Sequence, residues 1–421
     1  MNRLLLLIFI VVIVLIGALA LPASARGQNN DITVAVDGLP VAFDVPPVIR
    51  DGRTLVPFRA IAEAINVNVT WDGTTRTVNA TDGKTFIKLL IGNCTAYYNE
   101  SSISLDVAPA ILGGRTLVPL RFFSEAFGCT VLWESTIRSV KITSAPKTIT
   151  VTGFYALGDA RTSSWTDLFG GVYPETGTGN TDMVSVVALG WYSLSQEGIL
   201  LTSSGTGWQR PPGWEKVLES AEGYGLKTEM VIHLTDSDNF ITCLLSDESA
   251  TTTAVDEIVK EAGAYQSVNL DFEGLGLSAA GEDLSAVRYR FTDFVRLLST
   301  RLKSAGKTLT LTLHAPNSAY KGYDYRALGE LSDRIIIMAY DYGPKPEPVN
   351  LVTEAVAMAK AVIPPEKLML GISAPSETPE SMFTKVGIAK RYNLDGIALW
   401  RLGLVSQEMW DVLRTAVVAR N

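Results

Sequence analysis

The chain has 421 residues, of which 47% are hydrophobic and 19% charged, a composition that supports two or three domains with their own cores. The net charge is −8 and no run of Lys and Arg occurs, so a nucleic-acid partner is not expected. The two histidines, His233 and His314, and the three cysteines, Cys94, Cys129 and Cys243, match no metal-ligand spacing. The sequence therefore predicts an activity without a metal or other cofactor.

Residues 1–25 have the pattern of a secretory signal peptide. A short basic region precedes the apolar run 4–21, and Ala-Ser-Ala at 23–25 provides a cleavage site. The pattern predicts a secreted or cell-envelope protein of a bacterium, with the mature chain beginning near Arg26. The alternative is an uncleaved membrane anchor, because the run approaches the roughly 20 apolar residues that span a bilayer.

A repeat with a shift of 62 residues organises the first third of the chain. Residues 51–80 realign on 113–142, and both segments contain GRTLVP, then an arginine, then a glutamate. Each unit is predicted to form a hairpin, a Pro-bounded loop and an amphipathic helix, closed by a strand that contains Trp71 or Trp133. Four arginines recur in the two units, Arg53 with Arg115 and Arg59 with Arg121. They are expected to pair with Glu63 and Glu125 or to cap loops.

This repeat resembles the copper amine oxidase N-terminal-like, or stalk, domain of exported bacterial proteins over residues 31–144. It contains no histidine with which to bind copper. The resemblance implies a non-catalytic module for display or for attachment to the cell wall. Outside the cell, Cys94 and Cys129 either pair or remain free thiols.

Residues 148–421 alternate predicted strands with helices. About 275 residues remain after the boundary at 144–147, close to the ~250 of one (β/α)8 barrel. No Gly-x-Gly-x-x-Gly follows the first strand, so a closed TIM barrel after a smaller α+β domain is predicted over a doubly wound sheet. The eight predicted strands are 148–156, 183–189, 227–233, 267–272, 308–314, 334–339, 367–372 and 396–400.

The fourth predicted strand carries polar residues at alternate positions, Asn269, Asp271 and Glu273. Alternate residues share one face of a strand, and the outer face of a barrel packs on apolar helices, so this trio is expected to point inward. Buried carboxylates are costly, and these lie at the C-terminal end of the strand, where barrel enzymes keep their active sites. The pattern therefore favours a catalytic site over a purely structural acidic pair.

The segment YQSVNLDFEG resembles the strand-four signature of glycoside hydrolase family 18, Asp-Gly-x-Asp-x-Asp-x-Glu, with its last two acids at Asp271 and Glu273. The resemblance covers about residues 148–415. Within the family, this segment is most similar to the chitinase-like group. Three further motifs of the family match in order: GFYA at 153–156, MAYDY at 338–342 and GIALWRLG at 396–403.

The chain also departs from the family pattern. Asn269 replaces the middle aspartate, and we expect it to hydrogen-bond Asp271 and to alter the pH profile without abolishing activity. The Ser-x-Gly-Gly signature of strand three is absent, and the 23 residues between Ile372 and Gly396 leave no room for the insertion domain of processive chitinases. These features resemble the spore-germination and cortex-lytic branch more than a true chitinase.

The resemblance implies retaining hydrolysis in which the N-acetyl oxygen of the substrate attacks the anomeric carbon, an exception to the two-carboxylate scheme. Glu273 would be the general acid and base, Asp271 would orient the acetamide, and Tyr340 would donate a hydrogen bond to it. We assign His314 no role, because a structural histidine is an equal alternative. The expected substrate-binding residues are Asn269, Asp341, Trp400, Trp191 and Tyr192, the last two as lining of the groove after strand two.

The leading hypothesis is an exported glycosidase that cleaves β-linked N-acetylglucosamine in peptidoglycan or spore cortex. The runner-up is a chitinase or chitooligosaccharidase. Two non-enzymatic alternatives are a sugar-binding surface protein and a structural surface protein whose stalk repeats do the main work. Glu273 argues for activity, because lectin-like members of the family usually lack this acid.

Overall fold

The computed structural model describes residues 32–155, 163–203 and 207–421. The predicted signal peptide lies outside the described residues. Within them, no helix is long and apolar enough to cross a membrane. Residues 32–421 cluster as one compact unit.

The N-terminal part repeats one strand–helix pair, as the sequence predicts. The four elements are β4 (Arg53–Pro57), α1 (Phe58–Ala64), β11 (Arg115–Pro119) and α2 (Leu120–Ala126). β4 and β11 pair antiparallel, with Val56 opposite Val118. Because these valines are equivalent in the two repeats, an approximate two-fold axis relates the units at this pair. Phe58, Ile61, Leu120 and Phe123 bury the inner faces of the two helices in a shared core.

The two repeats exchange strands, which corrects the expectation that each unit closes on itself. The Trp71 strand and its neighbour pair with the hairpin of the second unit, whereas the Trp133 strand and its neighbour pair with the hairpin of the first. The five-stranded sheet contains β5 (Asn68–Asp72), β6 (Thr77–Thr81), β7 (Phe86–Leu90), β8 (Thr95–Tyr98) and β9 (Ser101–Ser104). A four-stranded sheet contains β12 (Thr130–Glu134), β13 (Ser139–Thr143), β1 (Thr33–Val36) and β2 (Leu39–Pro40). The sheet around β4 and β11 adds β3 (Val48–Arg50) and β10 (Ala110–Leu112).

Two of the repeated arginines form ion pairs with aspartates of the other repeat. Arg53 binds Asp106 at 2.7 Å, and Arg115 binds Asp44, its equivalent across the two-fold axis. Arg121 lies 3.7 Å from Glu125, as expected. The first two arginines reach the opposite unit because β4 and β11 lie side by side at the centre of their sheet.

The cysteines of the N-terminal part do not pair. Cys94 is exposed, whereas Cys129 is buried, and both are free. Burial, together with the charge of Asp37, raises the pKa of the Cys129 thiol to about 11. A neutral thiol of this kind packs as a small apolar side chain.

Eight parallel strands close into a barrel, which confirms the predicted fold. The strands are β14 (Lys147–Tyr155), β15 (Val186–Leu194), β17 (Lys227–Thr235), β18 (Ser267–Glu273), β19 (Thr308–His314), β20 (Arg334–Met338), β21 (Leu368–Ser373) and β22 (Gly396–Trp400). Pairing of β22 with β14 closes the ring, with Thr150 opposite Gly396. Two short strands extend it, β16 (Leu200–Leu201) beside β15 and β23 (Val417–Ala419) beside β14.

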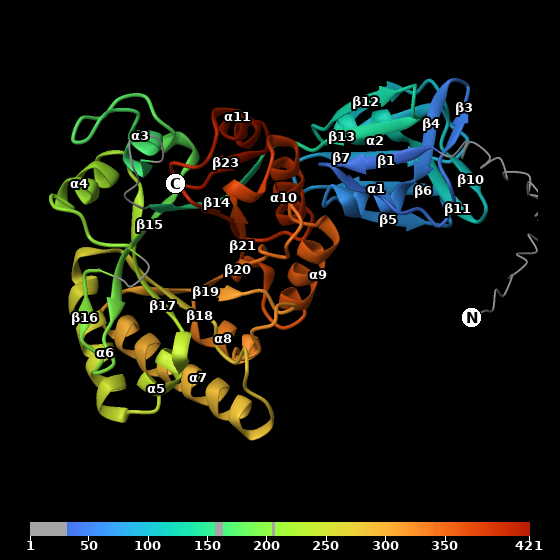
Figure 1. Cartoon of the computed structure of the whole chain (residues 1–421). Helices are drawn as coiled ribbons and strands as arrows, with labels where there is room; N and C mark the ends of the chain where they lie inside the picture. Colours follow the sequence, from blue (N-terminus) through green and yellow to red (C-terminus); the bar gives the residue numbers. More distant parts are fainter. Residues whose placement is uncertain (1–31, 156–162, 204–206) are drawn as a thin grey trace, which may run out of the picture. The chain divides into compact units, whose positions relative to one another are not determined.

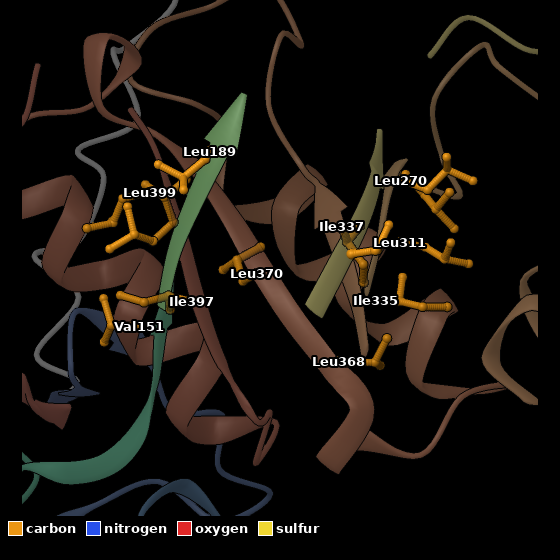
Figure 2. Close-up of a cluster of buried hydrophobic side chains, with 14 of the residues drawn as sticks. Val151, Leu189, Leu270, Leu311, Ile335, Ile337, Leu368, Leu370, Ile397 and Leu399 are labelled. Atoms are coloured by element: carbon orange, nitrogen blue, oxygen red, sulfur yellow. The ribbon is translucent and has the colours of Figure 1, made fainter. Parts of the chain in front are cut away.

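Helices surround the barrel (Figure 1). They are α3 (Ser164–Phe169), α4 (Glu215–Gly223), α5 (Phe240–Leu244), α6 (Glu248–Glu261), α7 (Gly281–Ser304), α8 (Tyr325–Leu331), α9 (Val349–Lys360), α10 (Pro379–Arg391) and α11 (Gln407–Ala416). Figure 2 shows aliphatic side chains of neighbouring strands in this core, among them Leu270, Leu311 and Ile337. Phe272 stacks on Phe294 of α7, with ring centroids 5.6 Å apart. The apolar residues of β18 therefore face the helices, and Asn269, Asp271 and Glu273 face inward as predicted.

Candidate active site

The two carboxylates of β18 differ in their contact with solvent. Asp271 is 2% exposed, whereas the side chain of Glu273 at the barrel mouth is 27% exposed. Burial, followed by the charge of Glu273, raises the pKa of Asp271 to about 8. This raised pKa favours the protonated form of Asp271, so that it can hold a proton for the more accessible acid.

Asp271 also has an oxygen without a partner. Its Oδ1 atom is fully buried and forms no hydrogen bond with any described residue. Buried polar atoms are nearly always hydrogen-bonded, and each exception calls for an explanation such as a catalytic role or a ligand. This oxygen is therefore a candidate hydrogen-bond acceptor for a ligand group.

Two histidines flank Glu273. His233 Nε2 lies 3.3 Å from Glu273 Oε1, and His314 Nε2 lies 3.8 Å from Oε2. Burial acts to lower the pKa of His233, but the hydrogen bond to Glu273 and the charges of Asp271 and Glu273 outweigh it and raise that pKa. For His314 burial prevails and lowers the pKa. His233 is thus the main donor to the Glu273 carboxylate.

The sequence did not single out His233. Its strand pairs with β18 so that His233 lies opposite Asp271, a register that the sequence alone does not give. His233, Asp271 and Glu273 each offer one atom that could coordinate a metal, and these three atoms lie within 4.8 Å of one another. A nitrogen and two carboxylate oxygens at this spacing could hold a divalent cation.

Asn269 lies below the site and is fully buried. It does not form the expected hydrogen bond to Asp271. Its amide donates to Glu229 Oε2 at 3.0 Å, and its carbonyl accepts from the Thr312 hydroxyl at 2.9 Å. Glu229, a buried acid that the sequence analysis missed, accepts this hydrogen bond, and its other oxygen accepts from the Thr310 hydroxyl at 2.8 Å. Asn269 is thus placed to support the strand and not to touch a sugar.

Tyr340 faces the two carboxylates from the end of β20. Burial, followed by the charges of Asp271 and Glu273, raises the pKa of its hydroxyl well above the ordinary value, so it remains a donor. Gly371 on β21 provides the space, because a Cβ atom there would lie 3.3 Å from the Tyr340 ring. The structure therefore brings Tyr340 to Asp271 and Glu273, as predicted.

Asp341 is exposed beside this site and has a left-handed backbone, with φ of 64°. Such a conformation is uncommon for residues other than glycine. The buried carboxylate of Glu347 accepts hydrogen bonds from the backbone N–H groups of Asp341 at 3.0 Å and Tyr342 at 3.1 Å. Glu347 thereby holds the turn that places Tyr340 and Asp341.

Trp400 ends β22 and is partly buried. Its ring centroid lies 5.4 Å from that of Phe154, in an edge-on arrangement, and 5.1 Å from that of Trp208, at an angle of 34° between the rings. Gly190 allows this approach, because a Cβ atom there would lie 2.6 Å from the Trp208 ring. Trp208 belongs to the loop after β16, and its proximity to Trp400 was not evident from the sequence.

Trp191 and Tyr192 do not line a groove, which corrects that prediction. They are 0% and 1% exposed. The Tyr192 hydroxyl forms hydrogen bonds with Tyr265 at 2.7 Å and with Glu261 at 2.8 Å. The reason is that β15 continues to Leu194, with a register shift between Leu189 and Tyr192, so both rings belong to the strand and its core.

Comparison with known proteins found a family match for the N-terminal part and relatives that match about two fifths of the chain. Residues 35–142 match the copper amine oxidase N-terminal domain. YdhD of Bacillus subtilis, which carries the name of a sporulation-specific glycosylase, is 30% identical over 177 residues, or 40% of this chain and 38% of its own length. The cortical fragment-lytic enzyme of Bacillus anthracis is 28% identical over 185 residues, or 38% of this chain and 41% of its own length. The chain thus matches about two fifths of the length of these relatives.

Solved structures confirm the fold of the barrel. The spore cortex-lytic enzyme SleL of Bacillus cereus superposes with a TM-score of 0.52 and 18% identity, covering 66% of this chain and 76% of SleL. A chitinase from Chromobacterium violaceum gives a TM-score of 0.51 and 18% identity, covering 63% of this chain and 98% of the chitinase. The chain therefore combines a segment that matches the copper amine oxidase N-terminal domain with a barrel of the fold shared by chitinases and spore cortex-lytic enzymes, the fold that the resemblance to glycoside hydrolase family 18 implied.

Proposed function

We propose that this protein is a retaining glycoside hydrolase that cleaves β-linked N-acetylglucosamine in cell-wall or spore-cortex glycan by substrate-assisted catalysis. The observation that carries the proposal is the buried, unpartnered Oδ1 of Asp271, whose carboxyl interacts electrostatically with Glu273 and Tyr340. An acetamido group offers one N–H donor and one carbonyl acceptor. Asp271 can accept from the first, and the Tyr340 hydroxyl can donate to the second.

In the first step the acetamido oxygen attacks the anomeric carbon while Glu273 gives its proton to the leaving oxygen. Glu273 receives this proton from the buried carboxyl of Asp271, and the negative charge that Asp271 gains stabilises the positive charge that develops on the acetamido group. His233, 3.3 Å from Glu273, keeps that carboxylate oriented. In the second step Glu273 accepts a proton from water, which attacks the same carbon and restores the original anomeric configuration.

The test is mass spectrometry of products from the chain without residues 1–25. Peptidoglycan from vegetative cells, spore cortex and chitooligosaccharides serve as separate substrates, and a Glu273→Gln variant runs alongside. Cleavage next to N-acetylglucosamine is expected, with a loss of about 10³-fold or more in the variant, because Gln cannot donate the proton. Glu282→Gln, a change at an exposed position of α7, is the matched control and should retain activity.

The same experiment separates the alternatives. Cleavage of chitooligosaccharides alone would favour a chitinase, which the fold shared with chitinases allows. Sugar binding without any product would leave a sugar-binding surface protein. Proton NMR of the first product anomer tests retention, and an inverted anomer would contradict the substrate-assisted mechanism.

We also propose that the protein is exported and that its N-terminal domain attaches it to the wall. The support is the signal pattern of residues 1–25 and the match of residues 35–142, which precede the barrel in the chain, to the copper amine oxidase N-terminal domain. Cell fractionation is expected to find the full chain in the envelope or medium, and a chain without residues 1–25 in the cytoplasm. Retention of both in the cytoplasm would contradict export.

A further inference from the structure

Three donor atoms of the candidate active site have the spacing of a metal site. The imidazole of His233 and the carboxylates of Asp271 and Glu273 each offer one atom, and the three atoms lie within 4.8 Å of one another. His233 Nε2 is 3.3 Å from Glu273 Oε1. Two ligands of a tetrahedral zinc ion, with bonds of about 2.0–2.1 Å, are about 3.3–3.4 Å apart, so this pair already has the required separation.

Two neighbouring strands hold these donors. His233 on β17 lies opposite Asp271 on β18, and Glu273 lies two residues further along the same face of β18. Residues paired between parallel strands present their side chains on the same side of the sheet, so all three reach the inside of the barrel. Sites built on strands are held more precisely than sites on loops, and little rearrangement is needed to close this set around an ion.

An unsatisfied oxygen in this set points to a ligand. Asp271 is 2% exposed, and its Oδ1 forms no hydrogen bond with any described residue. A buried carboxylate oxygen without a donor is costly, and a cation is one partner that satisfies it. The side chains of His233 and Glu273 are 14% and 27% exposed, so an ion can reach the set from solvent.

The types of donor indicate which ion fits. An imidazole nitrogen together with carboxylate oxygens suits zinc and the neighbouring transition metals. Mg²⁺ and Ca²⁺ instead prefer six or more oxygen ligands. Three protein ligands leave the fourth tetrahedral position of zinc to a water molecule.

We propose that His233, Asp271 and Glu273 bind one Zn²⁺ ion and that the bound ion inhibits the glycosidase. The inhibition rests on the proposed function, whereas the binding does not. Coordination uses the Nε2 lone pair of His233 and both carboxylates, so the protons that these atoms carry pass to solvent. Glu273 then has no proton for the leaving oxygen, and Asp271 cannot accept from the acetamido N–H. Zinc and the substrate therefore compete for the same groups.

Equilibrium dialysis with metal analysis measures the binding. All proteins carry Cys94→Ser and Cys243→Ser, because exposed free thiols bind zinc themselves. One Zn²⁺ per chain is expected, and Mg²⁺ in about hundredfold excess should not displace it. His233→Gln is expected to raise Kd at least about tenfold, because it removes a ligand. His314→Gln is the matched control and should leave Kd close to that of the background protein, since its ring lies outside the three-atom set.

Thermal unfolding is a second readout and shows that the variants are folded. Zn²⁺ should raise the Tm of the background protein, because a ligand that binds only the folded state stabilises it. The Tm of His233→Gln should not respond at the same zinc concentration. Glu273→Gln, which removes a carboxylate ligand, should show the same loss of response.

Cleavage rates test the inhibition. Zn²⁺ is expected to raise the apparent KM and to leave kcat unchanged at saturating substrate, and EDTA should restore the original rate. Absence of zinc binding, or an equal Kd in His233→Gln, would overturn the site and leave the glycosidase proposal intact. A cleavage rate that bound zinc does not change would overturn the inhibition. Zinc binding that depends on His233 in a protein that cleaves no glycan would support the metal site and contradict the proposed function.

Discussion

Replacement of Asp271 with Asn is expected to slow glycan cleavage strongly and, relative to wild type, to stabilise the fold increasingly as pH rises. Asn keeps the size of the side chain but cannot hold or release the proton that the mechanism passes to Glu273. A loss of about 10²-fold or more in kcat is expected, the size found when a preorganised electrostatic group at a reacting centre is removed. The wild-type rate should in turn fall above about pH 8, where Asp271 loses its proton.

The effect on stability follows from the same pKa. Asp271 has a pKa of about 8 in the folded chain, against about 3.9 for an unfolded aspartate. The protonated form is favoured by folding, so its contribution to stability is complete below about pH 4 and is lost as pH rises toward 8. The asparagine of the variant cannot ionise and has no such loss. The difference in unfolding free energy should grow by up to about 1.4 kcal/mol per pH unit in this window, or about 2–3 kcal/mol from pH 5 to pH 7.

Denaturant unfolding of wild type and Asp271→Asn at pH 5, 6 and 7, followed by tryptophan fluorescence, measures this difference. Asp293→Asn, an exposed change on α7, is the control and should give a difference that does not depend on pH. A difference for Asp271→Asn that stays constant across the three pH values would show that the carboxyl is not held protonated by the fold.

The barrel and its acidic strand could be predicted because both depend on local patterns. The alternation of Asn269, Asp271 and Glu273 with apolar residues fixes which face of β18 is inside, and Phe272 against Phe294 agrees. The eight strands could be located from β-branched runs and the spacing between them. Tyr340 was expected from the resemblance of MAYDY at 338–342 to a family motif, and its place after a strand agrees, since the carboxyl ends of parallel strands meet at one rim.

Other features depend on contacts between distant segments. His233 belongs to the site because β17 and β18 pair in one register, and Trp208 reaches Trp400 because Gly190 leaves space. Glu229 competes successfully for Asn269, which no spacing in the sequence reveals. Trp191 and Tyr192 were misplaced because the end of β15 was set too early, and strand ends are the least certain part of a pattern.

The second large effect is expected from Lys385, which lies on α10 and supports the turn of Tyr340 and Asp341 from below. Its side chain is 2% exposed and pairs at 3.3 Å with Glu377, whose side chain is 1% exposed. It also donates to the backbone carbonyl of Glu347 at 2.7 Å. The carboxylate of Glu347 in turn holds the N–H groups of Asp341 and Tyr342.

Lys385→Met is expected to destabilise the fold by about 3–5 kcal/mol, because it leaves the Glu377 carboxylate buried without a counter-charge. Adding Glu377→Gln should recover much of this loss, since the double variant contains no unpaired buried charge. Lys216→Met, which removes a half-exposed lysine from a surface pair on α4, is the control and should cost less than about 1 kcal/mol.

Measuring activity distinguishes the two roles of Lys385, which balances the charge of Glu377 and donates a hydrogen bond to the Glu347 carbonyl. The double variant restores charge balance but not the hydrogen bond to the Glu347 carbonyl, so the turn remains less firmly held. Its kcat is therefore expected to stay about tenfold below wild type even where thermal unfolding shows recovered stability, because small displacements of catalytic groups are costly. Full recovery of both kcat and stability would mean that Lys385 only balances Glu377, and that Glu347 holds the Tyr340 turn without help from α10.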